Sequence, residues 1–180
     1  SVGFLSGLLS SLIGNNKAGV WISSQRSVFP PALKTFGLEP DRVLFVDLPR
    51  EKDVQWAMEE ALKCSAITVA VAEMRDISFT ASRRLQLAVE ESKVTGFILR
   101  TNSKKPTTTA CVSRWRITPL PSETLGDLPG MGFPRWKVEL LRIRNGRPGS
   151  WNVEWRGDRF AIIDIDLHSS LNNPLLIKAG

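Results

Sequence analysis

The amino-acid sequence predicts an α/β domain, in which a mainly parallel sheet flanked by helices is followed by an antiparallel β-hairpin extension. Two observations lead to this fold class. Up to Arg100, short continuous apolar runs alternate with segments of helical apolar spacing, which is typical of strands joined by crossover helices. After Arg100, apolar residues alternate with polar ones, which is typical of half-exposed antiparallel strands.

The first part of the chain is expected to hold four strands, at 18–23, 42–47, 66–72 and 96–100. Their apolar runs are continuous, so both faces of the sheet are expected to be covered. The helices between them are expected at 52–65 and from Ser78 or Thr80 to Ser92, with a hydroxyl side chain capping the second helix.

The opening segment, 2–13, has the spacing of a helix with one apolar and one polar side. The apolar stripe comprises Phe4, Leu5, Leu8, Leu9 and Leu12. The polar side comprises Ser6, Ser10 and Ser11. This run is shorter than the ~20 residues of a membrane span, and it lacks the basic start of a signal peptide.

Proline and glycine positions suggest how the chain is divided. We expect an α/β core, an irregular Pro/Gly linker, a basic β-hairpin of the same domain and a tail, at 1–118, 119–134, 135–167 and 168–180. The hairpin turn is the segment Asn145 to Gly149 between two period-two apolar sets. Because the chain begins at Ser1 without Met, the core is expected to lack its true N-terminus.

The charge of the 180 residues is uneven. The chain has 24 Lys and Arg against 18 Asp and Glu, a net charge of +6. Residues 101–180 hold 12 of the basic and seven of the acidic residues, so five of the six excess charges lie there. An acidic or phosphate-bearing partner is therefore expected at the second part of the chain. With two cysteines, a disulfide framework is not expected, and a cytoplasmic location is.

Few residues suggest catalysis. The segment Gly14 to Lys17 lacks the spacing of a phosphate-binding loop. Glu73 ends the third strand, where related folds place a metal-holding or water-activating carboxylate, although a solvated strand-end charge is the alternative. The one histidine, His168, has no triad partners in its surroundings. Cys64 and Cys111 have no second pair to complete a zinc site.

Arginine and lysine are interleaved with tryptophan in the second part of the chain. The clearest cases are Arg114-Trp115-Arg116, Arg135-Trp136-Lys137 and Trp155-Arg156. Such pairs suit phosphate contact and base stacking. Strand alternation favours core positions for Trp136 and Trp155 instead, and leaves the cations exposed to DNA or to an acidic protein.

Three stretches, Asp53–Leu62, Thr80–Ala88 and Pro134–Trp151, resemble in this order the ImuA family, the RecA-like accessory proteins of bacterial SOS mutagenesis. The most specific is the run RWKVELLRIRNGRPGSW that begins at Arg135. The resemblance implies a RecA-like core, of the P-loop NTPase type. It also implies a role beside ImuB, a catalytically inactive Y-family polymerase homologue, beside an error-prone α-type polymerase and in modulation of RecA.

An ungapped alignment with the RecA pattern implies that the nucleotide site has been lost. The phosphate-loop Lys and Thr fall on Ser1 and Val2, and the water-activating carboxylate falls on Gln25. A neutral amide cannot accept a proton from water at pH 7. The switch glutamine falls on Arg100. The protein is therefore expected to be no enzyme and to hold no cofactor or metal.

The resulting prediction is an adaptor of error-prone DNA repair that works by binding partner proteins, with DNA as a further candidate partner. The expected contact rim comprises Arg135, Lys137, Arg142, Arg144 and Arg147, with Lys104 and Lys105 on the loop that faces DNA in RecA. The alternatives are a division inhibitor similar to SulA and a RecA-like DNA-dependent ATPase.

Overall fold

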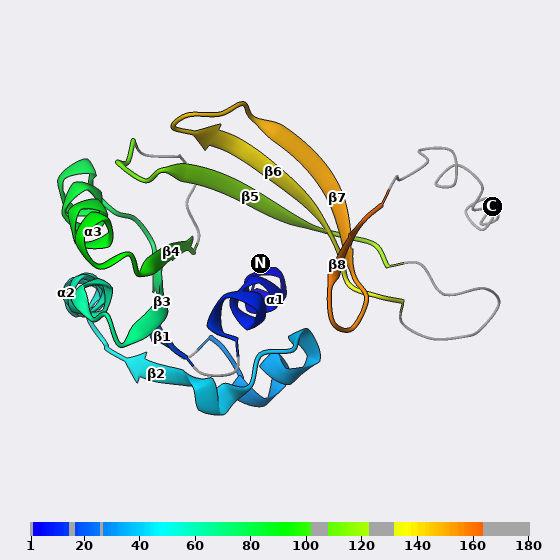
Figure 1. Ribbon diagram of the computed structural model, residues 1–180, viewed down its shortest axis with the longest axis horizontal. Helices are drawn as coiled ribbons and strands as arrows, with labels where there is room; N and C mark the ends of the chain where they lie inside the picture. The colour runs from blue at the N-terminus through cyan, green and yellow to red at the C-terminus, as the bar shows by residue number, and fades with distance from the viewer. Residues whose placement is uncertain (1, 15–16, 26, 102–107, 123–131, 164–180) are drawn as a thin grey trace, which may run out of the picture.

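The computed structural model describes residues 2–14, 17–25, 27–101, 108–122 and 132–163. It has the predicted α/β architecture, with a four-stranded parallel sheet, helices on both of its faces and a separate antiparallel sheet (Figure 1). The proposed tail, 168–180, and most of the linker lie outside the described residues, as do His168, Lys104, Lys105 and Ser1.

The parallel sheet has the strand order β2-β1-β3-β4. Its strands are β1 (Ala18–Ser23), β2 (Val43–Asp47), β3 (Ile67–Met74) and β4 (Thr95–Arg100), all within a few residues of the predicted runs. The central strand β3 is buried from Val69 to Met74. This burial on both faces explains why its sequence is continuously apolar up to Glu73 rather than alternating.

One face of this sheet is covered by α2 (Glu51–Lys63) and α3 (Phe79–Ser92), which pack side by side. Val54, Met58 and Leu62 of α2 are buried against the sheet at the predicted helical spacing. Of the two predicted caps of α3, Ser78 is the one used, because its Oγ accepts a hydrogen bond from the Ala81 amide at 3.1 Å.

The opposite face is covered by α1 (Val2–Ile13) and two short 3-10 helices, η1 (Pro30–Phe36) and η2 (Pro40–Arg42). Leu5, Leu9 and Ile13 of α1 pack against Trp21 of β1 and its neighbours in β3. Together with α2 and α3, α1 completes a three-layer arrangement (Figure 1).

The second sheet is antiparallel and arches over α1 (Figure 1). Its strands follow in chain order, β5 (Ser113–Leu120), β6 (Arg135–Ile143), β7 (Gly149–Trp155) and β8 (Phe160–Ile162). The predicted hairpin is therefore the β6–β7 pair. The predicted boundary at residue 118 falls inside β5, which pairs with β6 and not with the parallel sheet. The turn-rich sequence after β5 therefore lies between two strands of the same sheet and does not separate the core from the second sheet.

The burial of side chains in α1 differs from the polar and apolar sides predicted for the opening segment. Ser6 is fully buried, and its Oγ donates a hydrogen bond to the Val2 carbonyl at 2.9 Å. Leu12, predicted on the apolar stripe, is 40% exposed. The reason is that α1 lies between two sheets, so its burial extends around more of the helix than one sheet could cover.

An aromatic cluster joins α1 to the second sheet. Trp136 and Trp155 are buried, as the alternation of the sequence favoured, and they pack with Phe4, Phe36 and Phe160 at ring-centroid distances of 4.9–6.1 Å. The Trp155 Nε1 donates to the Thr35 carbonyl at 3.0 Å, which satisfies the polar end of this indole.

Gly7 provides the close approach between α1 and this cluster. A Cβ at position 7 would lie 2.7 Å from the Phe160 ring and 2.9 Å from the Trp155 ring. Overpacking of this kind forces side chains and backbone apart. We therefore expect Gly7→Leu to lower the free energy of unfolding by about 1–3 kcal/mol, measured by urea denaturation. Ser11→Leu, at an exposed position on the same helix, is the control; equal stability of the two variants would contradict the packing described.

Candidate functional site

The strand order defines one candidate site, at the carboxyl edge of the parallel sheet. From β1 the chain leads to β2 on one side, whereas β3 and β4 lie on the other side. In open α/β sheets, ligands bind in the crevice at such a switch point, outside the carboxyl ends of the strands. Here the switch point lies between the carboxyl ends of β1 and β3, where Ser23 and Glu73 are found.

Glu73 is buried at this switch point, with 5% of its surface exposed. The indole Nε1 of Trp21 donates to its Oε1 at 2.7 Å, and the hydroxyl of Ser27 donates to its Oε2 at 2.5 Å. The alternative of a solvated strand-end charge is therefore wrong. Both carboxylate oxygens hold parts of the chain, so the group links β1, β3 and the segment after β1.

The positions that align with the RecA nucleotide site have different environments in the structure. Val2 is half-buried at the start of α1, and Gln25 is exposed after β1. Arg100 ends β4, and its Nη2 lies 2.7 Å from the Asp76 Oδ1. An arginine paired with a carboxylate therefore lies at the position where the RecA pattern has a glutamine.

Metal ligands do not gather in the part of the chain that the structure describes. Within it, no three His, Cys, Asp or Glu side chains are placed to hold a metal ion. Cys64 is exposed and Cys111 is half-buried, and both are free thiols. Of the described helices, none is long and apolar enough to cross a membrane.

The residues of the predicted contact rim do not form one surface. Arg142, Arg144 and Arg147 are exposed at one end of the β6–β7 hairpin. Lys137 is exposed in the middle of β6 and lies 3.3 Å from the Glu139 carboxylate. Arg135 is at the other end of β6, with only 12% of its side chain exposed. The structure thus brings together the last three cations of the predicted set.

A cavity of about 230 Å³ lies between α3 and the end of β6, and three arginines line it. Arg142 and Arg144 were expected from the sequence, whereas Arg83 of α3 was not. Its sequence signal is only a charged position on the outer side of a helix. The described lining contains no acidic side chain, and Thr108 and Thr109 add hydroxyl groups. Guanidinium and hydroxyl groups in this arrangement suit a phosphate group.

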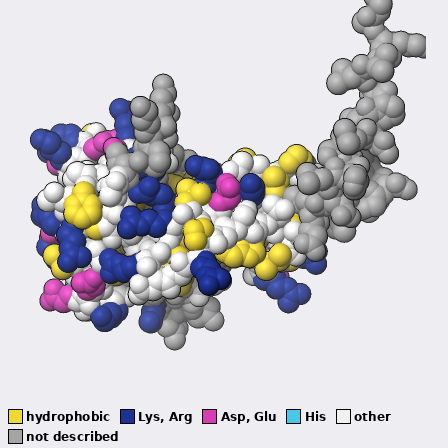
Figure 2. Space-filling view, turned by 90° about the horizontal axis from the view of Figure 1, so that it is seen from above, with side chains coloured by type: hydrophobic (Ala, Val, Ile, Leu, Met, Phe, Trp, Pro, Cys, Tyr) yellow, Lys and Arg dark blue, Asp and Glu magenta, His cyan; other side chains and the backbone are white. Residues whose placement is uncertain are grey.

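Basic side chains also gather more widely around this cavity. Figure 2 shows Lys and Arg over α3 and the neighbouring part of the antiparallel sheet, with few Asp and Glu between them. The Arg144 guanidinium lies 4.0 Å from the Glu90 carboxylate, at the limit of an ion pair. Within the part of the chain that the structure describes, Arg142 has no ion-pair partner. This end of the sheet is therefore strongly positive.

At the other end of the sheet, Arg135 belongs to a buried ion-pair network. Its Nε lies 2.6 Å from Glu154 Oε2, and the Arg156 Nε lies 2.9 Å from Glu154 Oε1. Burial by itself would raise the pKa of Glu154, but the hydrogen bonds from Arg135 and Arg156 outweigh it and hold this pKa below its ordinary value of 4.5. Arg135 thus has a structural role in this fold.

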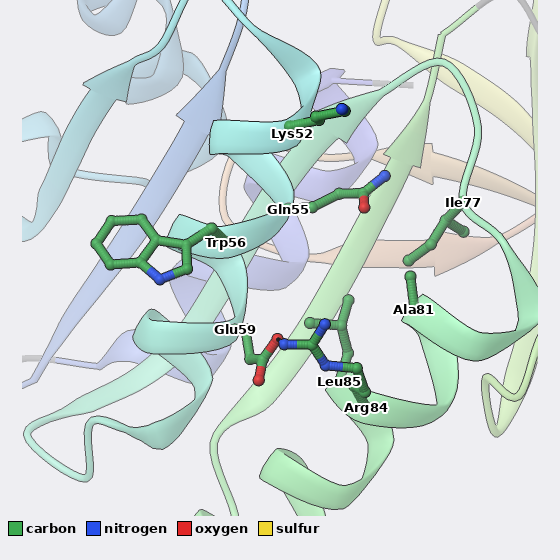
Figure 3. A pocket seen from close by; sticks show the side chains of 8 residues that line it. All are labelled: Lys52, Gln55, Trp56, Glu59, Ile77, Ala81, Arg84 and Leu85. Carbon is green, nitrogen blue, oxygen red and sulfur yellow. Dashed lines mark ion pairs between the residues drawn. The ribbon is translucent and has the colours of Figure 1, made fainter.

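A second cavity, of about 160 Å³, lies between α2 and α3 (Figure 3). Its lower part is closed by the ion pair of Arg84 and Glu59 at 2.7 Å. Trp56 is at its edge, 65% exposed, and its indole extends away from α3. Pockets for drug-sized ligands measure roughly 300–1,000 Å³, so this cavity and the arginine cavity are both small for a nucleotide.

Comparisons with known proteins bear on this architecture. No protein-family model matches the sequence. Two curated relatives, from two strains of Caulobacter vibrioides (NA1000/CB15N and ATCC 19089), are both named Protein ImuA. Each is 38% identical over 146 residues, which cover 76% of this chain and 60% of the relative. The chain thus spans about three fifths of the length of the curated relatives it matches.

Among solved structures, the chain is similar to the crystal structure of SulA from Pseudomonas aeruginosa, with a TM-score of 0.48 and 18% sequence identity. That match covers 55% of this chain and 85% of the other.

The ion-pair network at Glu154 gives a test of the buried end of the sheet. Glu154→Gln leaves the Arg135 charge buried without its carboxylate, so we expect a loss on the order of 3 kcal/mol in the free energy of unfolding near pH 7. Because the folded pKa of Glu154 is lowered, its contribution is complete above pH 4.5 and is lost as the pH falls through the folded pKa.

The difference between wild type and E154Q should therefore shrink in acid, measured by urea unfolding at several pH values. Glu139→Gln, which affects an ion pair with the exposed Lys137, should cost less than about 1 kcal/mol. A pH-independent difference for E154Q would contradict the assignment.

Proposed function

Because this chain belongs to the ImuA family, we propose that it is a non-catalytic accessory protein of SOS mutagenesis. It acts in the cytoplasm as an adaptor for an ImuB-type inactive polymerase homologue and an error-prone α-type polymerase, and as a modulator of RecA. In this proposal a RecA-like frame is retained and the nucleotide site is not. The fold has the parallel sheet and flanking helices that such a frame requires.

The observation that carries the proposal is the state of Glu73. A carboxylate that holds a catalytic metal or activates water needs a free oxygen facing the substrate. The two oxygens of Glu73 accept hydrogen bonds from Trp21 and Ser27, and the side chain is 5% exposed. Gln25 and Arg100 at the aligned positions support the same proposal, because neither side chain can act as a base at pH 7.

The contact surface in this proposal is the positive end of the antiparallel sheet. Arg142 and Arg144 lie together there, with Arg83 from α3. A concentration of cations with little acidic compensation attracts an acidic protein surface or a phosphate backbone and speeds association. Lys137 and Arg135 contribute less, because each lies beside a carboxylate.

The absence of catalysis is tested with ATP. We expect the full-length protein to release no phosphate above background with or without DNA, and Glu73→Gln to leave this result unchanged while it lowers stability by about 1–3 kcal/mol through the altered hydrogen bonds. Phosphate release is measured with a coupled assay. Turnover that E73Q abolishes, in a variant whose thermal unfolding shows that it is folded, would contradict the proposal and favour a RecA-like ATPase.

The adaptor role is tested by capture of the purified ImuB-type homologue from the same organism. We expect the full-length protein to retain it in a pull-down and to have no effect on assembly of the tubulin-like division protein, which a division inhibitor would block. R142E/R144E should weaken capture or DNA binding by about tenfold or more, because two attractive charges become repulsive. Lys137→Glu is the control. Capture and DNA binding that both survive R142E/R144E would remove this surface from the proposal.

A further inference from the structure

Two tryptophans on the second sheet are exposed although they share a face with its aromatic core. Trp115 is directly opposite Leu140, and Trp151 is directly opposite Val138. Since Val138 and Leu140 are two residues apart on β6, both indoles lie on the face that holds the buried Trp136. Yet Trp115 and Trp151 are 48% and 39% exposed.

These two indoles form a held pair. Their ring centroids are 6.4 Å apart, with an angle of 39° between the planes. The Nε1 of Trp115 donates to the Ser113 hydroxyl at 3.0 Å. The Trp151 ring lies against Gly149, where an added Cβ would be only 2.6 Å from it. Each ring is therefore held in place by a contact with the chain, while about two fifths or more of each residue is exposed to solvent.

The arginine cavity lies at the same end of the sheet. Arg114 precedes Trp115 on β5, so the two side chains lie on opposite faces of the sheet. Arg114 is directly opposite Arg142 and shares its face. Arg142 and Arg144 line the cavity with Arg83. The place for phosphate and the pair of exposed aromatic rings thus lie at the same end of the sheet, on its two faces, with the edge strand β5 between them.

We propose that this end of the second sheet binds single-stranded DNA that passes around the edge strand β5, with bases stacked on Trp115 and Trp151 on one face and a backbone phosphate in the cavity of Arg83, Arg142 and Arg144 on the other. The inference rests on the proposed function and names the ligand of its contact surface. Stacking on aromatic side chains beside a positive groove is how proteins hold single strands without sequence preference. A duplex hides its base faces, and an acidic protein surface would use the arginines without needing the indoles.

The test measures the anisotropy of a fluorescein-labelled oligothymidylate of about 16 nucleotides bound by the full-length protein. We expect Trp115→Ala and Trp151→Ala each to weaken binding by about 5- to 150-fold, the range found for the loss of one stacked base. Arg142→Gln and Arg144→Gln should each reduce the slope of log affinity against log salt by about 0.7, the value for one phosphate contact on a single strand.

Two variants elsewhere are matched controls. Trp56→Ala removes a still more exposed indole from α2, and Arg84→Gln removes an exposed arginine from α3, neither of them on the second sheet. Both should bind the oligonucleotide as the wild type does. The same oligonucleotide paired with its complement should bind more weakly than the single strand.

Conservative variants separate stacking from packing, in case the alanine variants unfold. Trp→Phe at 115 and 151 keeps an aromatic face and should retain most of the affinity, whereas Trp→Leu keeps apolar area and should lose it. Single-strand affinity that is unchanged in W115L/W151L overturns the proposal. So does a loss seen with the arginine variants alone, which would indicate plain charge attraction.

Capture of the ImuB-type homologue by the same variants keeps this inference apart from the proposed function. If W115A/W151A loses DNA and still captures the homologue, both proposals are supported. If the protein captures the homologue and binds no single strand, the DNA site is wrong and the adaptor role stands.

Discussion

The burial of α1 between two sheets is the constraint on which the rest of the structure depends. Leu5, Leu9 and Ile13 pack against the parallel sheet, while Phe4 packs with the aromatic side chains of the antiparallel sheet. Without this helix, only η1 and the residues next to it would cover the inner faces of the two sheets, because α2 and α3 are on the far side of the parallel sheet. A helix with two covered sides therefore joins what would otherwise be two separate layers.

This arrangement also separates structural from binding residues on the antiparallel sheet. Where α1 and η1 cover it, Trp136 and Trp155 are buried, and Arg135 is fixed by Glu154. Beyond that cover, the same face exposes Trp115 and Trp151. Residue type alone therefore does not indicate the role of a tryptophan here. The tryptophans on this face are buried at one end of the sheet and exposed at the other. The positions of α1 and η1 make the difference.

The parallel sheet differs from that of an active nucleotide-binding fold at its carboxyl edge. In such folds the crevice at the switch point is open to ligand. Here an indole and a hydroxyl donate hydrogen bonds to the Glu73 carboxylate at this point. The buried carboxylate, with both oxygens bonded, links β1, β3 and the segment after β1.

Local pattern in the sequence determined most of the elements: the continuous runs of β1 to β4, the helical spacing of α2 and α3, a hydroxyl cap for α3 at Ser78 or Thr80, the β6–β7 hairpin and the family resemblance of Pro134–Trp151. It also indicated that Trp136 and Val138 share a face, because alternation is a property of the strand itself. Only the tertiary structure decided what covers each face. The buried Ser6, the engaged Glu73, the assignment of β5 to the second sheet and the meeting of Arg83 with Arg142 all depend on contacts between segments far apart in the chain, and no local period encodes those contacts.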